Sequence, residues 1–135
     1  LYVTTSGTSH TAQYALAKML DSATNNEFNF IKVTSEYGKR AEKVKEIFLK
    51  YGFKQVYKKD MDEPVGNGFY LTMSYPKYTG NDLMLELLRY GISTITLKST
   101  GSVRHEGLRV CISFIGLEEV PMLESKLQKF MEDHK

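Results

Sequence analysis

Apolar residues recur every three or four positions in four stretches of the chain, which is the spacing of helices with one face toward a core. We predict helices over residues 10–23, 27–51, 79–90 and 117–133. The second has its clearest apolar stripe in its C-terminal half, and Gly52 stands where a left-handed C-cap is expected. Thr34, Ser35 and Gly38 weaken its N-terminal half, which predicts a kink or a restart near Ser35.

Shorter stretches have the alternation, or the β-branched and aromatic content, of strands. They predict strands over residues 53–58, 68–74, 92–97 and 108–114, with a turn-rich loop over 60–67 and a polar loop over 99–107. In the last strand four apolar residues alternate with polar ones and are expected to face the following helix. These four are Leu108, Val110, Ile112 and Phe114.

The order of these elements predicts the fold class. Two helices come first, followed by two strands, a helix, two strands and a final helix. This order favours an α+β fold with a small mixed or antiparallel sheet of about four strands. The helices are expected mainly on one face of that sheet, and the second helix is expected to be a long N-terminal linking helix.

The length of 135 residues fits one domain better than two, with residues 1–51 as a helical linking region and 52–135 as a sheet-and-helix domain. Hydrophobic residues make up 41% and charged residues 25%, which argues against disorder of the whole chain. The chain begins with Leu1 rather than methionine. We interpret it as a piece cut from a longer protein or as a trimmed chain.

Charge and cysteine usage exclude several classes of protein. The net charge of +2 comes from interspersed acidic and basic residues, whereas nucleic-acid binders usually concentrate basic residues on one face. No apolar run approaches the roughly 20 residues of a membrane span, and no signal-peptide pattern opens the sequence. Cys111 is the single cysteine, so an internal disulfide is impossible. We expect a cytoplasmic protein that binds neither nucleic acid nor membrane.

Arg109 is our candidate for a ligand-binding residue. The alternation of the last predicted strand places Arg109, Cys111 and Ser113 on the face away from the helices. A guanidinium there needs an anion or open water, and it binds a carboxylate through two parallel hydrogen bonds. The alternatives are an ion pair with a local glutamate and simple solvation at the sheet surface.

Other polar groups indicate structure rather than chemistry. The run 104–106 (RHE) has no further ligand at metal-binding spacing, and we interpret it as a mobile charged loop. His10 stands alone near a helix start, and His134 is expected in a fraying tail. Cys111 is interpreted as a buried structural thiol. We therefore assign no catalytic, metal-binding or cofactor-binding residue.

Six short segments follow one another over nearly the whole chain. They are residues 6–20 (SGTSHTAQYALAKML), 37–40 (YGKR), 64–71 (PVGNGFYL), 87–92 (LLRYGI), 107–113 (GLRVCIS) and 116–130. In this order they resemble the C-terminal part of aspartate-aminotransferase-type enzymes, which are fold-type I pyridoxal-phosphate-dependent transferases. One departure is that residues 97–101 (LKSTG) lack the family's usual Pro-Gly turn and aromatic residue near the substrate.

The resemblance implies a role for Arg109 and implies that substrate and cofactor are bound by different parts of the enzyme. It implies that Arg109 binds the α-carboxylate of an amino-acid substrate in an enzyme that exchanges an amino group between an amino acid and a 2-oxo acid. It also implies pyridoxal phosphate, held by groups that precede Leu1. Lys18, Lys32 and Lys39 do not stand in the family's lysine context. We therefore expect this chain alone to bind no cofactor and to be inactive.

The resemblance also implies partners. We expect the missing large domain, the amino-acid or 2-oxo-acid substrate of the parent enzyme, and a second copy of the chain in a homodimer. Two alternatives stay open. One is a free-standing α+β module that binds a ligand or a partner, and the other is the small domain of a pyridoxal-phosphate-dependent lyase or decarboxylase.

Overall fold

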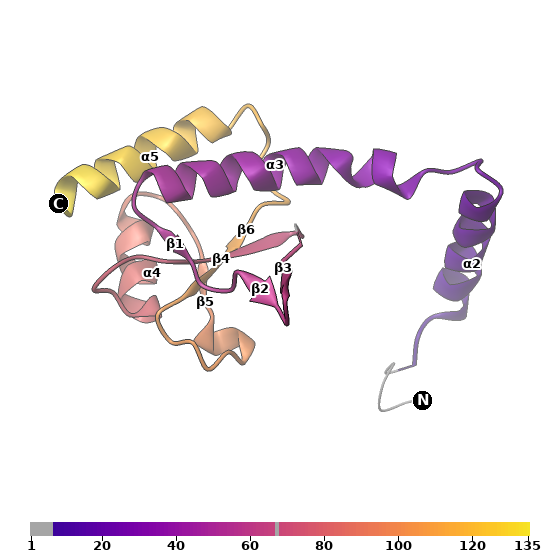
Figure 1. Cartoon of the computed structure of the whole chain (residues 1–135), viewed down its shortest axis with the longest axis horizontal. Coiled ribbons are helices and arrows are strands. Elements are labelled where there is room, and N and C mark those ends of the chain that lie inside the picture. The colour runs from indigo at the N-terminus through magenta and orange to yellow at the C-terminus, as the bar shows by residue number, and fades with distance from the viewer. Residues whose placement is uncertain (1–6, 67) are drawn as a thin grey trace. The chain divides into compact units, whose positions relative to one another are not determined.

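The computed structural model describes residues 7–66 and 68–135 and has an α+β fold (Figure 1). The described residues form the helices α2 (His10–Thr24), α3 (Phe30–Lys50), α4 (Gly80–Arg89) and α5 (Val120–Asp133), and a 3-10 turn, η1 (Lys98–Thr100). The strands are β1 (Lys54–Gln55), β2 (Lys59–Asp60), β3 (Glu63–Pro64), β4 (Tyr70–Ser74), β5 (Ile95–Thr96) and β6 (Leu108–Cys111). The chain divides into two compact units, Leu1–Ser35 and Glu36–Lys135.

The first unit contains α2 and the beginning of α3. The prediction of a helix over 10–23 is confirmed, although none of the residues of α2 is buried. Its apolar side chains are therefore exposed, and Tyr14 and Leu16 keep 77% and 54% of their surface. The next helix starts at Phe30 rather than at residue 27, because Asn29 Oδ1 accepts a hydrogen bond from the Lys32 amide at 2.9 Å and caps it.

The restart that the sequence allowed near Ser35 does not occur, since α3 is one continuous helix. The hydroxyl groups of Thr34 and Ser35 donate to the backbone oxygens of Phe30 and Lys32, each at 2.9 Å. These bonds to earlier turns satisfy both side chains without opening the helix. At the other end the predicted C-cap is confirmed: Gly52 has a φ of 88°, and the Phe53 amide donates to the Phe48 oxygen at 3.1 Å.

The second unit is built on a four-stranded sheet with the strand order β1-β4-β6-β5. Every neighbouring pair of strands is antiparallel. Of the two predicted alternatives, a mixed or an antiparallel sheet, the structure therefore has the antiparallel one. Helix α4 lies between β4 and β5 in the chain and lets the sequence cross to the far edge of the sheet. Two further strands, β2 and β3, pair as a separate hairpin inside the segment predicted as a loop.

Helices α3, α4 and α5 share one hydrophobic core with one face of the sheet. Figure 1 shows α3 and α5 side by side over the strands, where Lys50 Nζ donates to Glu124 Oε1 at 2.6 Å. The buried residues come from α3 (Ala41, Val44, Ile47, Phe48), α4 (Leu83, Leu87), α5 (Val120, Leu123, Leu127, Phe130) and the sheet (Leu71, Met73, Leu108, Val110). Helices α3, α4 and α5 therefore form one layer over one face of the sheet, and none of these three covers the other face.

Strand β6 is shorter than the alternation predicts. Leu108, Val110 and Ile112 are buried as expected, but Phe114 is 89% exposed, so its predicted inward orientation is wrong. The reason is that pairing ends early: the Ile112 amide donates to the Phe69 oxygen at 2.9 Å, and the chain then turns, with the Ile115 amide donating to Ile112. A residue beyond the last pairing position no longer follows the alternation of the strand.

Candidate functional site

The sheet face opposite helices α3, α4 and α5 is centred on Arg109. Thr72 of β4 and Ile95 of β5 lie directly opposite Arg109, and Tyr70 lies opposite Cys111. Residues opposite each other in antiparallel strands point to the same side, so these five side chains share one face. We call these five residues the Arg109 face.

The guanidinium of Arg109 stacks on a tyrosine and has an open edge. Its Cζ lies 4.3 Å from the centre of the Tyr70 ring. Arg109 is half-buried, yet no hydrogen bond or ion pair joins its guanidinium to any other residue that the structure describes. The glutamate pairing that the sequence left open is therefore not formed by the described residues. A planar group backed by a ring, with free N–H donors at its edge, suits bidentate binding of a carboxylate.

At one end of the Arg109 face, apolar side chains close the surface. Val56 and Leu97 are buried and lie around Gly107, where a Cβ would come within 2.3 Å of Leu97 Cδ1 and 2.9 Å of Val56 Cγ2. The Val56 amide donates to the Thr72 oxygen at 2.9 Å and extends the pairing of β1 with β4. Only glycine lets the chain enter β6 this close to its neighbours.

Near the other end, three of the segments quoted above meet. Arg40 Nη1 donates to the Ser113 backbone oxygen at 3.4 Å, and Arg40 also forms an ion pair with Glu36. The ring of Tyr37 lies 5.1 Å from that of Phe69, edge to face. Parts of these three segments are therefore neighbours in space, although Arg40 and Ser113 are 73 positions apart in sequence.

Cys111 lies beside Arg109 on the same face and is half-buried rather than buried as predicted. Its Sγ is 3.2 Å from the Ser113 hydroxyl. Burial alone raises the pKa of the thiol, but the Ser113 hydroxyl, the backbone amides of Ser113 and Phe114, and the charge of Arg109 together bring the pKa below its ordinary value. The thiolate is therefore easier to form here than at an isolated cysteine.

The run 104–106 is held in place rather than free as predicted. Arg104 Nη2 lies 2.6 Å from Glu106 Oε1, and the Arg104 amide donates to the Ser102 hydroxyl at 2.9 Å. The Ser102 hydroxyl in turn lies 2.5 Å from that of Tyr57. The hydrogen bond from Arg104 lowers the pKa of the Glu106 carboxyl. Within residues 7–66 and 68–135 no group of three histidine, cysteine or acidic side chains is placed to hold a metal ion.

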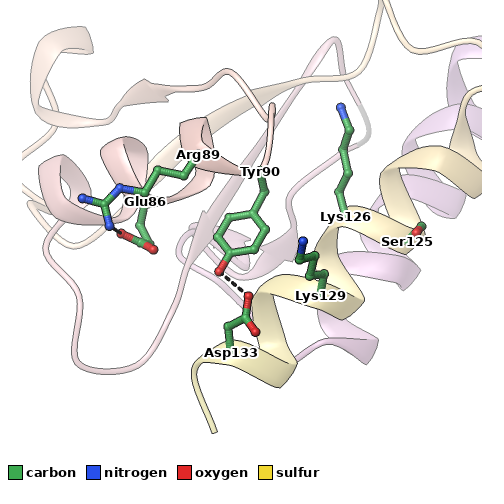
Figure 2. Close-up of a pocket in the computed structure, with 7 residues that line it drawn as sticks. All are labelled: Glu86, Arg89, Tyr90, Ser125, Lys126, Lys129 and Asp133. Atoms are coloured by element: carbon green, nitrogen blue, oxygen red, sulfur yellow. Dashed lines mark hydrogen bonds and ion pairs between the residues drawn. The ribbon is translucent and has the colours of Figure 1, made fainter.

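A pocket of about 550 Å³ lies between α4 and α5, on the helix side of the sheet (Figure 2). It is lined by Glu86, Arg89 and Tyr90 and by Ser125, Lys126, Lys129 and Asp133. Figure 2 shows Arg89 folded onto Glu86 and the Tyr90 hydroxyl directed at Asp133, at 3.0 and 2.8 Å. Lys126 Nζ donates to the Gly91 oxygen at 3.0 Å. Glu86 and Arg89 thus pair within α4, whereas the bonds from Tyr90 to Asp133 and from Lys126 to Gly91 join the end of α4 to α5.

His134 belongs to the same junction, and its predicted place in a fraying tail is wrong. Its ring stacks on Phe130 with centroids 4.4 Å apart and planes at 23°. Nδ1 lies 2.7 Å from the Phe130 backbone oxygen, and Nε2 lies 3.3 Å from Glu86 Oε1. The histidine therefore ties the end of α5 to α4. His10, by contrast, is the first residue of α2 and is exposed.

The alternation in the sequence indicated Arg109 as a candidate but did not predict its contact with Tyr70. Tyr70 on β4 lies diagonally across from Arg109 on β6, and no local sequence pattern predicts a contact between residues of different strands. No protein-family model matches the chain, and no curated protein has a significantly similar sequence. None of the helices in the described part of the chain is long and apolar enough to cross a membrane.

Proposed function

We propose that this chain is the substrate-carboxylate-binding domain of a pyridoxal-phosphate-dependent aminotransferase, with Arg109 as the residue that binds the carboxylate. The observation that carries the proposal is the open guanidinium edge of Arg109, stacked on Tyr70 at the centre of the sheet face opposite α3, α4 and α5. The resemblance supports it, because three of its segments are neighbours in the fold.

Arg109 would orient the substrate rather than react with it. Two parallel hydrogen bonds fix the plane of a carboxylate and with it the direction of the bonds at the α-carbon. Such positioning contributes several kcal/mol to lowering a barrier. The ring of Tyr70 limits the rotation of the guanidinium, so the donors stay directed outward.

The cofactor does not fit on the Arg109 face. Pyridoxal phosphate serves as the electron sink in amino-group transfer and needs a lysine, an acidic partner for its ring nitrogen and donors for its phosphate. The four positions around Arg109 supply neither a lysine nor a carboxylate. We therefore assign the cofactor groups to the large domain of the parent enzyme.

The proposal includes partners and a location. The partners are the large domain and a second copy of the chain in a homodimer, and the exposed apolar side chains of α2 offer them a surface. The location is the cytoplasm, which suits the single free cysteine. A lyase or decarboxylase of the same fold would use Arg109 in the same way.

The open guanidinium also favours a second candidate, a free-standing module that binds a carboxylate. The sequence of the gene upstream of Leu1 distinguishes these two candidate functions. An aminotransferase requires a lysine-bearing large domain encoded upstream of Leu1, whereas a module requires translation to start at or near Leu1. If translation starts there, the aminotransferase proposal is overturned.

The kinetic test uses the full-length product of the gene. Arg109→Lys keeps the charge but loses the two-pronged contact, so kcat/KM for amino transfer should fall roughly tenfold to hundredfold, the value of a hydrogen bond between charged groups. Arg104→Lys is the matched control, because Arg104 binds Glu106 on a surface loop. An unchanged kcat/KM in Arg109→Lys would refute the role of Arg109.

A further inference from the structure

The described residues that neighbour Arg109 on the paired strands are uncharged. Its four neighbours on the Arg109 face are a tyrosine, a threonine, an isoleucine and a cysteine. Two of them offer open apolar surface, since Tyr70 is 49% and Ile95 is 43% exposed. They lie on opposite sides of Arg109, one on β4 and the other on β5. A ligand on the guanidinium therefore contacts apolar side chains on both flanks.

Among the strand residues that share this face, the one lysine is distant from Arg109. Lys54 lies opposite Ser74, at the far edge of the sheet. That position is two strands and two residues from Arg109, roughly 12 Å at ordinary strand spacing. The two carboxylates of a short dicarboxylic acid are closer together than this. A second carboxylate would therefore lie against Tyr70 or Ile95 and not beside a cation.

We propose that the Arg109 face selects monocarboxylates with an apolar substituent, such as branched-chain or aromatic 2-oxo acids, over dicarboxylates. This inference rests on the proposed function and adds the substrate class to it. The apolar substituent is removed from water against Tyr70 and Ile95, which favours binding. A second carboxylate loses hydration there without gaining a partner, which opposes binding.

Titration of the 135-residue chain by NMR tests the preference. The Arg109 Nε–H resonance is assigned by its loss in Arg109→Lys and is then followed against 4-methyl-2-oxopentanoate and against 2-oxoglutarate at equal ionic strength. We expect the monocarboxylate to have the lower Kd by about tenfold, the size of discrimination that one well-placed apolar contact gives.

A charge added on the Arg109 face should reverse the preference. Ile95→Lys places a cation directly opposite Arg109 on the edge strand β5, so 2-oxoglutarate should then bind more tightly than 4-methyl-2-oxopentanoate. Leu85→Lys is the matched control, because Leu85 is 58% exposed on α4 and adds the same charge away from the sheet face. That control should keep the preference of the unaltered chain.

The outcomes distinguish the two proposals. If 2-oxoglutarate binds the unaltered chain as tightly as the monocarboxylate, the inferred substrate class is wrong while Arg109 remains a carboxylate site. If Ile95→Lys does not shift the preference, the neighbours of Arg109 do not select the ligand, and the inference is likewise overturned. If neither acid shifts Arg109, the proposed function fails and the inference fails with it.

Discussion

The guanidinium carbon of Arg109 lies 4.3 Å from the centre of the Tyr70 ring. The contact is diagonal, because the residue directly opposite Tyr70 is Cys111 and Arg109 lies two positions earlier on β6. Long and aromatic side chains reach across such diagonals in antiparallel sheets. The ring covers one flat side of the guanidinium and leaves its hydrogen-bonding edge available. The ring therefore restrains the Arg109 side chain while its N–H donors stay available to a ligand.

Replacement of Tyr70 should weaken carboxylate binding without unfolding the chain. Tyr70→Leu removes a cation–π contact of about 0.5–2 kcal/mol and lets Arg109 rotate freely, so the affinity for a carboxylate should fall roughly twofold to thirtyfold. Tyr70→Phe keeps the ring and should bind almost as well as the unaltered chain. Calorimetric titration with a 2-oxo acid measures both, and equal affinity in the leucine variant would contradict a positioning role for the ring.

The thiol of Cys111 should report the charge of Arg109. Because its pKa lies below the ordinary value, the alkylation rate should rise with pH at a lower midpoint than for a free cysteine. Iodoacetate carries a carboxylate and should react faster than expected from its rate with a free thiol, whereas neutral iodoacetamide should not. Arg109→Gln should remove this advantage and move the midpoint to higher pH. The same iodoacetate rate in both proteins would show that Arg109 attracts no anion there.

Two glycine replacements should have opposite effects on stability. Gly80 closely approaches the segment that leads into β6: an added Cβ would lie 2.7 Å from the Gly107 oxygen and 2.9 Å from the His105 oxygen. Gly80→Ala should therefore lower the free energy of unfolding by about 1–3 kcal/mol. Gly38 lies inside α3 with nothing within 4 Å of an added Cβ, so Gly38→Ala should raise it by about 0.5–1 kcal/mol. Urea unfolding measures both changes, and a neutral Gly80→Ala would refute the close approach.

The hydrogen bond between Tyr90 and Asp133 should make stability fall at high pH. Burial, followed by the bond to Asp133, raises the pKa of Tyr90 from 10.0 to about 12. The stabilisation by the neutral phenol is complete below pH 10 and is lost as pH rises toward about 12. Tyr90→Phe should cost about 1 kcal/mol at pH 7, and this difference from the unaltered chain should shrink above pH 10. A difference that is constant with pH would contradict the bond.

Much of the fold follows from local patterns. The helix starting at His10 and the C-cap at Gly52 were predicted because periodicity and glycine preference act within a few residues. The strand lengths were not predictable in this way. Phe114 continues the alternation of β6 in sequence but lies outside it in the structure, because the end of the strand depends on where pairing with β4 stops.

The candidate site likewise has one part that local sequence predicts and one part that it does not. The alternation of β6 places Arg109 on the face opposite its buried residues, and this requires no knowledge of other strands. Its contact with Tyr70 and its uncharged neighbour Ile95 depend on strand order and register, which local sequence does not determine. The anchoring of His134 likewise depends on Glu86, 48 residues earlier in the chain. Contacts between residues far apart in sequence therefore account for the differences between the predicted and the observed site.

The most direct test of the central claim is whether Arg109 binds a carboxylate at all. Pyruvate is titrated into the labelled chain while the Nε–H resonances of Arg109 and Arg104 are followed together. Arg104 serves as an internal control because its guanidinium already binds Glu106. We expect a saturable downfield shift of Arg109, little change at Arg104, and loss of high-affinity binding in Arg109→Lys. If Arg109 shifts no more than Arg104, the Arg109 face is not a carboxylate site.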